Sequence, residues 1–466
     1  MTNLTPGTQN LRTEHQLDHN SGTVLARYDN VAATSKIKRI FMYSNAPPKA
    51  LSYHRTPIRV LNGLVAVLNR AGLAQIKLDE NSLLASAREQ TGLTDFGDDR
   101  FLQPMRRLLQ ALEQEAGLNP VGRFMNRVSI VRILKNRLYV QDLLRKHPEI
   151  IERPVPDPVV IVGLARSGTT RLHRLLAADD RFLHLKAWES VNPVPLPQSY
   201  TQQPDPRITS IEQGLKAVLY MSPQIASVHP LGAHEVEEEV GLIQHSFSSQ
   251  LFEIQAKIPS FAEWLMTHNQ HSAYEYMVTL LKVISWYRND PLDKPWILKT
   301  PQHMQDLDAL MHVFPNAKLI CSHRDPIKAV GSACSMTWNA IVRDSHTVTA
   351  NWVGQEWLEK TERMLKKTER IRREIVPKNN QYDVLYADIG NDWQQSVSDI
   401  YRFLGMEFSD QAMAGMQRWR ASNQQHKHGF HNYKLEDFGL DRDTVDERLM
   451  FYRREHAIPY ENDNPH

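Results

Sequence analysis

The sequence has few cysteines, no long apolar run and almost no net charge. Its 466 residues include two cysteines, Cys321 and Cys334, which are too few for a disulfide framework or a tetrahedral thiolate metal site. Such sparing use of thiols is typical of a reducing compartment, so we expect a cytoplasmic protein. No stretch approaches the roughly 18 apolar residues of a membrane span, and residues 1–20 lack the apolar core of a signal peptide. We therefore expect no transmembrane segment.

Positive and negative charges nearly cancel. The chain has 55 Lys and Arg against 53 Asp and Glu, which gives a formal net charge of +2. This balance provides no bulk attraction to nucleic acid or to an anionic membrane. We therefore expect no nucleic-acid partner, and any basic site must be local.

Three segments of the chain differ in pattern. Residues 1–49 are polar and weakly patterned, which indicates an N-terminal arm. Residues 50–153 carry apolar stripes at helical spacing, which predict a helical addition. Its helices are expected from Thr56 onwards and at 81–90, 100–116 and 120–146. Three prolines in ERPVPDPVV then mark a boundary, and residues 154–466 are predicted to form the main domain.

Short apolar strands alternate with helices after this boundary. The strands are expected at 159–162, 296–298, 319–321 and 383–386. This alternation predicts an α/β fold, with a parallel sheet flanked by helices. Ligands of such folds bind at the carboxyl ends of the strands. Arg166, Lys299 and Arg324 follow three of these ends and Tyr386 ends the fourth strand, which favours an anionic ligand.

The segment VVIVGLARSGTTRLHRLL, residues 159–176, resembles a phosphate-binding loop. Gly163 and Gly168 have the spacing of G-x-x-x-x-G-K-[ST], but Thr169 stands where a nucleoside triphosphatase has lysine. The only cation inside the loop is Arg166. A buried strand that leads into a helix N-terminus still predicts an anion site. A P-loop kinase or NTPase-like phosphotransferase is the alternative, but it would need another lysine and a metal ligand that the sequence does not reveal.

A second candidate anion site lies in CSHRDPIKAVGSACSM, residues 321–336. Arg324 leaves the predicted strand, Pro326 suits an early helical position, and Ser332 lies about two helical turns after the arginine. Together they could hold a second phosphate. A capped helix with an exposed arginine explains the same pattern equally well.

With both loops in view, the chain resembles the sulfotransferases that use 3′-phosphoadenosine 5′-phosphosulfate (PAPS). Their 5′-phosphosulfate loop carries S-G-T-T after a strand, which matches residues 167–170. Their 3′-phosphate element runs from Arg through Pro to Ser, which matches 324–332. The segment 384–406 is similar to their Tyr-acidic-Leu stretch and the helix that follows it. The resemblance covers roughly 154–440 and is closest to the bacterial branch with Arg in the first loop.

The resemblance implies a P-loop-like fold and transfer of a sulfuryl group from PAPS to an acceptor hydroxyl, in line and without a metal ion. The implied donor-binding residues are Arg166, Ser167, Gly168, Thr169, Thr170, Arg324, Ser332, Tyr386, Lys427 and His428. Arg166 would stabilise the phosphosulfate, and Lys299 would face the transferred group. Lys427 and His428 match a late basic segment that closes over the 3′-phosphate in relatives.

Two residues compete for the role of general base. His234 in HPLGAHEVEEEVG has a side chain that accepts protons near neutral pH, and Glu238, one helical turn on, could orient it. The resemblance favours His234, because related bacterial enzymes place a histidine before acidic residues in this segment. Glu189 is the alternative, since distant relatives use a glutamate soon after the first helix. A solvated acidic face with an incidental histidine would give the same pattern.

The acceptor is indicated only by an aromatic segment. Residues 217–287 are rich in Met, Tyr, Phe and Trp, and such a set more often forms core than pocket. If part of it lines a cleft, the acceptor is a sizeable apolar alcohol or phenol, such as a lipophilic small molecule or lipid. The identity of the acceptor and the oligomeric state, for which a homodimer is one option, stay open.

Overall fold

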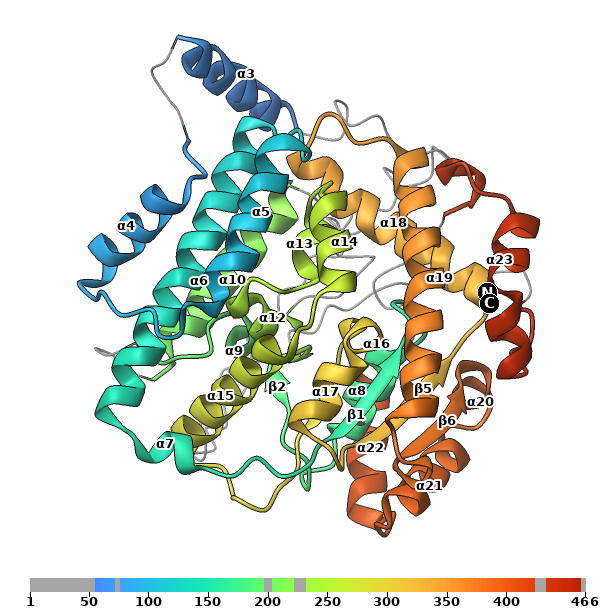
Figure 1. Ribbon diagram of the computed structural model, residues 1–466. Helices are drawn as coiled ribbons and strands as arrows, with labels where there is room; N and C mark the ends of the chain where they lie inside the picture. The colour runs from blue at the N-terminus through green and yellow to red at the C-terminus, as the bar shows by residue number, and fades with distance from the viewer. Residues whose placement is uncertain (1–54, 72–75, 197–202, 222–231, 424–432, 462–466) are drawn as a thin grey trace, which may run out of the picture. The chain divides into compact units, whose positions relative to one another are not determined.

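The computed structural model describes residues 55–71, 76–196, 203–221, 232–423 and 433–461. The described residues all belong to the larger compact unit of the chain, residues 45–466. Within the larger unit, many helices surround one parallel sheet (Figure 1). None of the described helices has an apolar stretch long enough to cross a membrane.

The central sheet has four parallel strands in the order β4-β1-β5-β6. Their bounds are β1 (Val159–Gly163), β4 (Ile297–Lys299), β5 (Lys318–His323) and β6 (Gln381–Leu385). These strands and their parallel pairing confirm the predicted α/β fold. Lys299 is the last residue of β4 rather than the residue after it. A separate antiparallel pair consists of β2 (Leu185–Lys186) and β3 (Val236–Glu237).

The described α-helices fall into three groups along the chain. Before β1 lie α3 (Thr56–Arg70), α4 (Glu80–Thr91), α5 (Leu102–Gln114), α6 (Pro120–Lys146) and α7 (Glu149–Glu152). Between β1 and β4 lie α8 (Thr169–Leu176), α9 (Ala187–Val191), α10 (Pro206–Met221), α12 (Val240–Ile243), α13 (Leu251–Gln255), α14 (Pro259–Thr267) and α15 (His271–Arg288). After β4 come α16 (Gln302–Gln305), α17 (Leu307–Val313), α18 (Pro326–Asp344), α19 (Ala350–Glu374), α20 (Tyr386–Asn391), α21 (Trp393–Leu404), α22 (Asp410–Ser422) and α23 (Arg442–Glu455).

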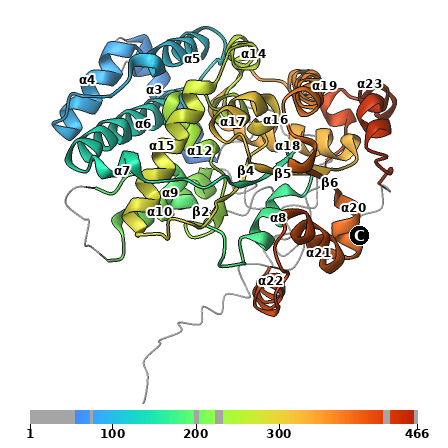
Figure 2. The ribbon, with the colours of Figure 1, turned by 60° about the horizontal axis from the view of Figure 1, so that its bottom comes forward.

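Helices cover both faces of the sheet, as expected of an apolar parallel sheet. Val160 and Val162 of β1 join a core with residues of α15, α17, α18 and α19. Val159 and Ile161, which alternate with them, join a second core with α8, α21 and α22. Figure 2 shows these two helix groups on opposite sides of the sheet. Burial on both faces explains why β1 is apolar throughout.

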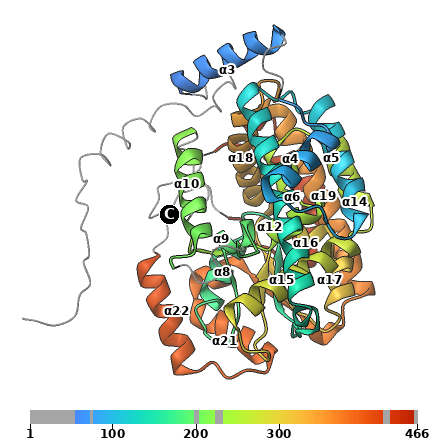
Figure 3. The same ribbon diagram turned by 90° about the vertical axis from the view of Figure 1, so that its left-hand side faces the viewer.

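The N-terminal helices share a core with a later segment of the chain. The helices expected at 81–90 and 120–146 are present as α4 and α6, and they lie side by side (Figure 3). Their buried side chains pack with α5 and with residues 247–265. In this core the rings of Phe101 and Phe247 stack with centroids 5.9 Å apart. The proposed division at residue 154 stays a prediction.

Candidate anion-binding site

Two residues with left-handed backbone conformations shape the loop between β1 and α8. Arg166 has φ of 70° and Gly168 has φ of 83°. A Cβ atom on Gly168 would lie 2.3 Å from Cδ2 of Tyr386, so glycine is required by both conformation and space. Ser167 is buried and its hydroxyl donates to the Leu164 carbonyl at 2.7 Å, which closes the loop. The loop therefore presents the first turn of α8, as the sequence predicts.

The two predicted anion loops contact each other directly. Arg166 Nε donates to Ser332 Oγ at 3.0 Å, although these residues are 166 positions apart. Arg324 Nη1 donates to the Arg166 carbonyl at 2.7 Å. Ser332 lies on α18, which begins at Pro326 directly after the turn that carries Arg324. The arrangement brings Arg166, Arg324 and Ser332 into one site.

Two guanidinium groups concentrate positive charge at this site. Burial lowers the pKa of Arg166, and the positive charge of Arg324 lowers it further. The guanidinium of Arg324 lies 4.3 Å from the ring centre of Tyr386, which places Tyr386 at the site as well. Because the two cations repel each other in a partly desolvated place, an anion that contacts both is electrostatically favoured.

Arg324 also has a carboxylate partner that no sequence pattern indicates. Its Nε donates to Glu461 Oε1 at 2.7 Å, and its Nη2 donates to Glu461 Oε2 at 2.8 Å. Burial lowers the pKa of Arg324, but the hydrogen bonds to Glu461, together with the charge interactions with Tyr386, Glu461 and Tyr433, raise it overall. Glu461 lies far along the chain from any motif, so sequence reasoning missed it.

Lys299 reaches the loop from the end of β4. Its side chain is only 1% exposed, and its Nζ donates to Thr170 Oγ1 at 2.9 Å. The same Nζ forms an ion pair with Glu238. A buried lysine requires such partners, because burying an unpaired charge is costly. Lys299 therefore points inward to the loop rather than out to solvent.

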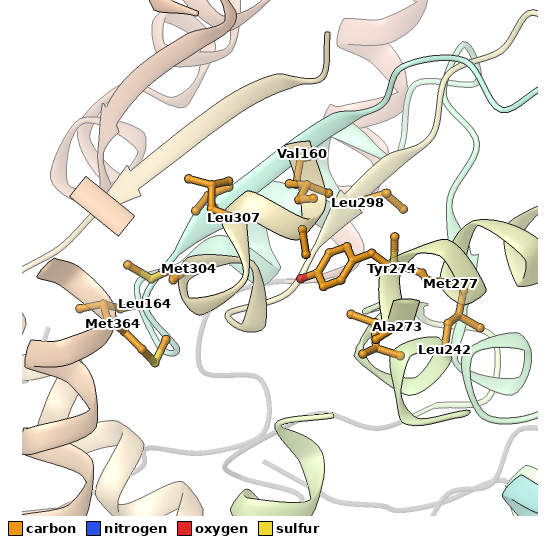
Figure 4. Close-up of a cluster of buried hydrophobic side chains, with 14 of the residues drawn as sticks. Val160, Leu164, Leu242, Ala273, Tyr274, Met277, Leu298, Met304, Leu307 and Met364 are labelled. Carbon is orange, nitrogen blue, oxygen red and sulfur yellow. The ribbon is translucent and has the colours of Figure 1, made fainter. Parts of the chain in front are cut away.

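A buried hydrogen-bond network lies behind Lys299. Glu239 accepts a hydrogen bond from the Lys299 backbone amide at 3.0 Å and contacts the ring of His303. Tyr274 bonds the other nitrogen of His303 at 2.9 Å, and Figure 4 shows Tyr274 among apolar side chains next to Leu298 of β4. Burial raises the pKa of Glu239, but His303, together with His173 and the Lys299 backbone amide, lowers it overall. This network fixes the end of β4, and no sequence pattern revealed it.

The acidic segment after His234 is not helical where the sequence suggested a helix. Val236 and Glu237 form β3, and α12 begins only at Val240. Glu238 pairs with Lys299, so the expected orientation of His234 by Glu238 is wrong. Neighbouring carboxylates repel one another, and the non-helical backbone allows Glu235, Glu238 and Glu239 to contact different partners, which are Arg174, Lys299 and His303. His234 itself is exposed, and no hydrogen bond joins its ring to another described residue.

Glu189, the alternative base, is held by several partners. It is 2% exposed, and its carboxylate pairs with Arg288, whose Nε donates at 2.7 Å. The backbone amide of Lys186 also donates to it at 2.9 Å, which caps α9. These contacts are those of a structural ion pair at a helix start.

A sequence model of the sulfotransferase family matches residues 158–410, which is more than half of the chain. The chain belongs to the sulfotransferase family. The resemblance stated from the two loops is therefore confirmed, and the matched range contains both loops and β4.

Several members of the family are similar to this chain. The crystal structure of sulfotransferase STF1 from Mycobacterium tuberculosis H37Rv has a TM-score of 0.70 and 31% identity, and the match covers 80% of this chain and 98% of that one. Sulfotransferase STF9 from Mycobacterium avium has a TM-score of 0.74 and 24% identity over 83% of this chain and 98% of that one, which shows the fold alone.

A curated relative carries a more specific name. Omega-hydroxy-beta-dihydromenaquinone-9 sulfotransferase Stf3 of Mycobacterium bovis is 26% identical over 267 residues. The match covers 55% of this chain and spans 65% of the length of that relative.

One cluster next to the site has the composition of a metal site. His323, Asp383 and His456 bring ligand-type atoms within 4.8 Å of one another. However, Asp383 Oδ1 already bonds His323 Nε2 at 2.7 Å and accepts from Arg372 Nη2 at 2.6 Å. Burial raises the pKa of Asp383, but His323 and Arg372 lower it to about 2. The positive charge of Arg372 opposes a cation here, so the contacts describe a network that supports the end of β5.

Two predicted residues cannot be placed. Lys427 and His428 lie outside the described residues. Both cysteines, by contrast, are described: they are buried free thiols, and burial raises the pKa of each to about 12.

Proposed function

We propose that this chain transfers a sulfuryl group from PAPS to a hydroxyl of a lipophilic acceptor. The observation that carries the proposal is the contact of the two anion loops through Arg166, Ser332 and Arg324. A donor with phosphate groups at both its 5′ and 3′ positions matches two adjacent anion sites. Membership of the sulfotransferase family supports the same reaction.

The 5′ half of the proposed site consists of the loop 163–170 together with Lys299. The amides at the start of α8 and the Arg166 guanidinium would hold the phosphosulfate. Lys299, next to Thr170, would stabilise charge that develops on the transferred group or the leaving phosphate. In-line transfer then depends on holding the acceptor oxygen opposite the leaving group. That the reaction needs no metal ion is part of the proposal.

The 3′ half consists of Arg324, Ser332 and Tyr386. Arg324 would bind the 3′-phosphate with its planar fork of donors, and Ser332 would add a hydroxyl. Tyr386 lies against Arg324 and fills the space next to Gly168, so it would support both halves. Lys427 and His428 are proposed as further contacts to the 3′-phosphate on the resemblance alone.

We propose His234 as the general base. Its exposed ring is available for an acceptor hydroxyl, whereas the Glu189 carboxylate is engaged by Arg288 and Lys186. Glu238 is a second candidate because it contacts Lys299, which itself contacts the loop. Its carboxylate therefore lies close to the proposed position of the transferred group.

The name of the Stf3 relative supports a lipophilic acceptor, because it describes a hydroxylated menaquinone. A small apolar cavity lies beside the loop, between Leu164, Pro301 and Trp357, but it is too small to hold such a molecule. The proposal of a lipid-like acceptor therefore rests on the relative and not on this cavity. A cytoplasmic location and a homodimer stay predictions.

The test separates the sulfotransferase from a phosphotransferase. The protein is titrated calorimetrically with adenosine 3′,5′-bisphosphate, adenosine 5′-monophosphate and ATP, in a buffer that contains EDTA. We expect the bisphosphate to bind more tightly than the other two nucleotides. Radiolabelled PAPS is then incubated with a panel of long-chain alcohols and phenols, and labelled products are separated. Tighter binding of ATP than of the bisphosphate would overturn the proposal and favour the alternative, a P-loop kinase or NTPase-like phosphotransferase.

A further inference from the structure

The segment after α23 is fixed at the 3′ half of the site. Arg453 Nη1 donates to the carbonyls of Ile458 and Pro459 at 3.2 and 3.3 Å. The Arg453 guanidinium lies 3.7 Å from the ring centre of Tyr460. One arginine of the preceding helix thus holds three successive residues, 458–460, and sets the direction in which the chain reaches Glu461. We call residues 456–461 the C-terminal strap.

The backbone of Glu461 is tied to the same element that carries Arg324. Its amide donates to Asp325 Oδ2 at 2.8 Å. Asp325 also caps α18 by accepting from the Ile327 amide at 3.0 Å, and it accepts from Arg453 Nη2 at 2.7 Å. The strap therefore places Glu461 by backbone contacts that do not depend on its own side chain.

The Glu461 side chain engages Arg324 in the way that a phosphate would. Nε and Nη2 of Arg324 each donate to one carboxylate oxygen, at 2.7 and 2.8 Å, which is the two-bond fork that arginine uses for carboxylates and phosphates alike. The third nitrogen, Nη1, donates to the Arg166 carbonyl. A 3′-phosphate that uses the same edge of Arg324 must displace Glu461.

We infer that Glu461 competes with the 3′-phosphate for Arg324 and so limits how tightly the donor and the bisphosphate product are held. This inference rests on the proposed function. Donor and product share the 3′-phosphate, so the competition weakens both. Weaker product binding favours release, a step that limits turnover in many enzymes. Glu461 is thereby an affinity-setting residue of the 3′ half.

The experiment compares two variants that lose the same charge. Glu461→Gln removes the competing charge but leaves the backbone bond to Asp325. Glu455→Gln is the matched control, because Glu455 lies on α23 and pairs only at the surface with Arg373, at 3.1 Å. Calorimetry measures binding of adenosine 3′,5′-bisphosphate and adenosine 5′-monophosphate at one ionic strength. We expect Glu461→Gln to bind the bisphosphate more tightly by on the order of tenfold, the size of a charged hydrogen bond. The monophosphate and the control should show no change.

Other outcomes overturn the inference in distinguishable ways. Weaker or unchanged bisphosphate binding in Glu461→Gln would mean that Glu461 orients Arg324 or does not matter. Equal tightening for both nucleotides would mean a general charge effect. In an Arg324→Ala background, Glu461→Gln should have no further effect on bisphosphate binding. If Glu461→Gln fails to fold, Glu461→Ser gives the same comparison. A wild-type protein that does not prefer the bisphosphate would overturn the proposed function and the inference together.

Discussion

The 5′ and 3′ halves of the proposed donor site differ in how far apart their residues lie in the sequence. Apart from Lys299, which comes from the end of β4, the 5′ half lies in one continuous segment, 159–176, in which strand, loop and helix follow directly. The 3′ half is assembled from the β5–α18 turn, Tyr386 after β6, and the C-terminal strap. Local backbone conformation therefore determines the first half, and tertiary packing determines the second.

The charges of the two halves also differ in their exposure. Lys299 at the 5′ half is 1% exposed, whereas the Arg324 side chain at the 3′ half is 20% exposed. Electrostatic interactions are stronger where water is excluded. We therefore expect changes at the 5′ side to affect turnover most, and changes at the 3′ side to affect donor discrimination.

The largest effect is expected for His234→Ala, which removes the proposed base without touching either half. Turnover should fall about 10²- to 10⁴-fold, because base assistance to an alcohol typically contributes this much. Affinity for the bisphosphate should stay near that of the wild type, since the loops at 163–170 and 324–332 are intact. Turnover and affinity are measured at one pH with one acceptor.

Two further variants show whether another residue has this role. Glu189→Gln should reduce turnover less than His234→Ala does, and Glu238→Gln should do the same. With a phenolic acceptor the effect of His234→Ala should shrink, because a phenol is more acidic and needs less help. A larger turnover loss in either glutamate variant would transfer the role of base to that residue.

The next largest effect is expected for Lys299→Met. A large loss of turnover in this variant would locate the stabilisation of the transferred group at the 5′ half. Turnover should fall about 10²- to 10³-fold, the range seen when one preorganised charge stabiliser is removed. Lys294→Met is the control, because Lys294 lies five residues earlier and only contacts the Asp180 carbonyl at the surface. An unchanged turnover number with saturating PAPS would remove Lys299 from the catalytic site.

The paired change Arg324→Ala with Ser332→Ala should affect recognition more than chemistry. Each charged hydrogen bond contributes about 1.5–3 kcal/mol. The preference for the bisphosphate over adenosine 5′-monophosphate should therefore drop by about tenfold or more. Turnover with saturating donor should fall less than in Lys299→Met. If the double variant still discriminates as the wild type does, the 3′ half lies elsewhere.

The smallest effect is expected for Gly168→Ala, where the two halves meet. Alanine at φ of 83° is strained by about 1–3 kcal/mol, and its Cβ would clash with Tyr386. Chemical denaturation measures the lost stability. Gly390→Ala is the control, since a Cβ there has no neighbour within 4 Å. Combining Gly168→Ala with Tyr386→Ala should relieve the clash and leave only the strain; full stability of Gly168→Ala would contradict this account.

The sequence was informative wherever a few neighbouring residues determine the structure. The apolar strand, the two glycines and the following helix stripe predicted the 5′ loop, and Pro326 predicted the start of α18. Parallel strands align their carboxyl ends, so Lys299 and Arg324 could be assigned to one edge of the sheet. These inferences need only periodicity and local conformational preference.

The remaining features depend on contacts between distant segments. Glu461 contacts Arg324, which lies 137 positions away in the sequence, and Glu239 contacts His303, which lies 64 positions away. No spacing rule marks such pairs. The acidic run at 235–239 was misleading for a related reason. Three of its carboxylates contact separate partners, which are Arg174, Lys299 and His303. These tertiary contacts, and not the spacing of the charges in the sequence, determine its backbone conformation.

Asp325 links the start of α18 to the C-terminal strap through hydrogen bonds. It accepts hydrogen bonds from the first turn of α18, from Arg453 and from the Glu461 amide. Detachment of the strap would therefore remove support from the carboxylate that caps the helix. In hydrogen–deuterium exchange, the amides of Ile327 and Glu461 should then become accessible at similar rates, as members of one cooperative opening unit. A ligand that anchors Arg324 and α18 should therefore slow exchange at both amides, because the Glu461 amide bonds Asp325 whether or not the Glu461 side chain stays on Arg324.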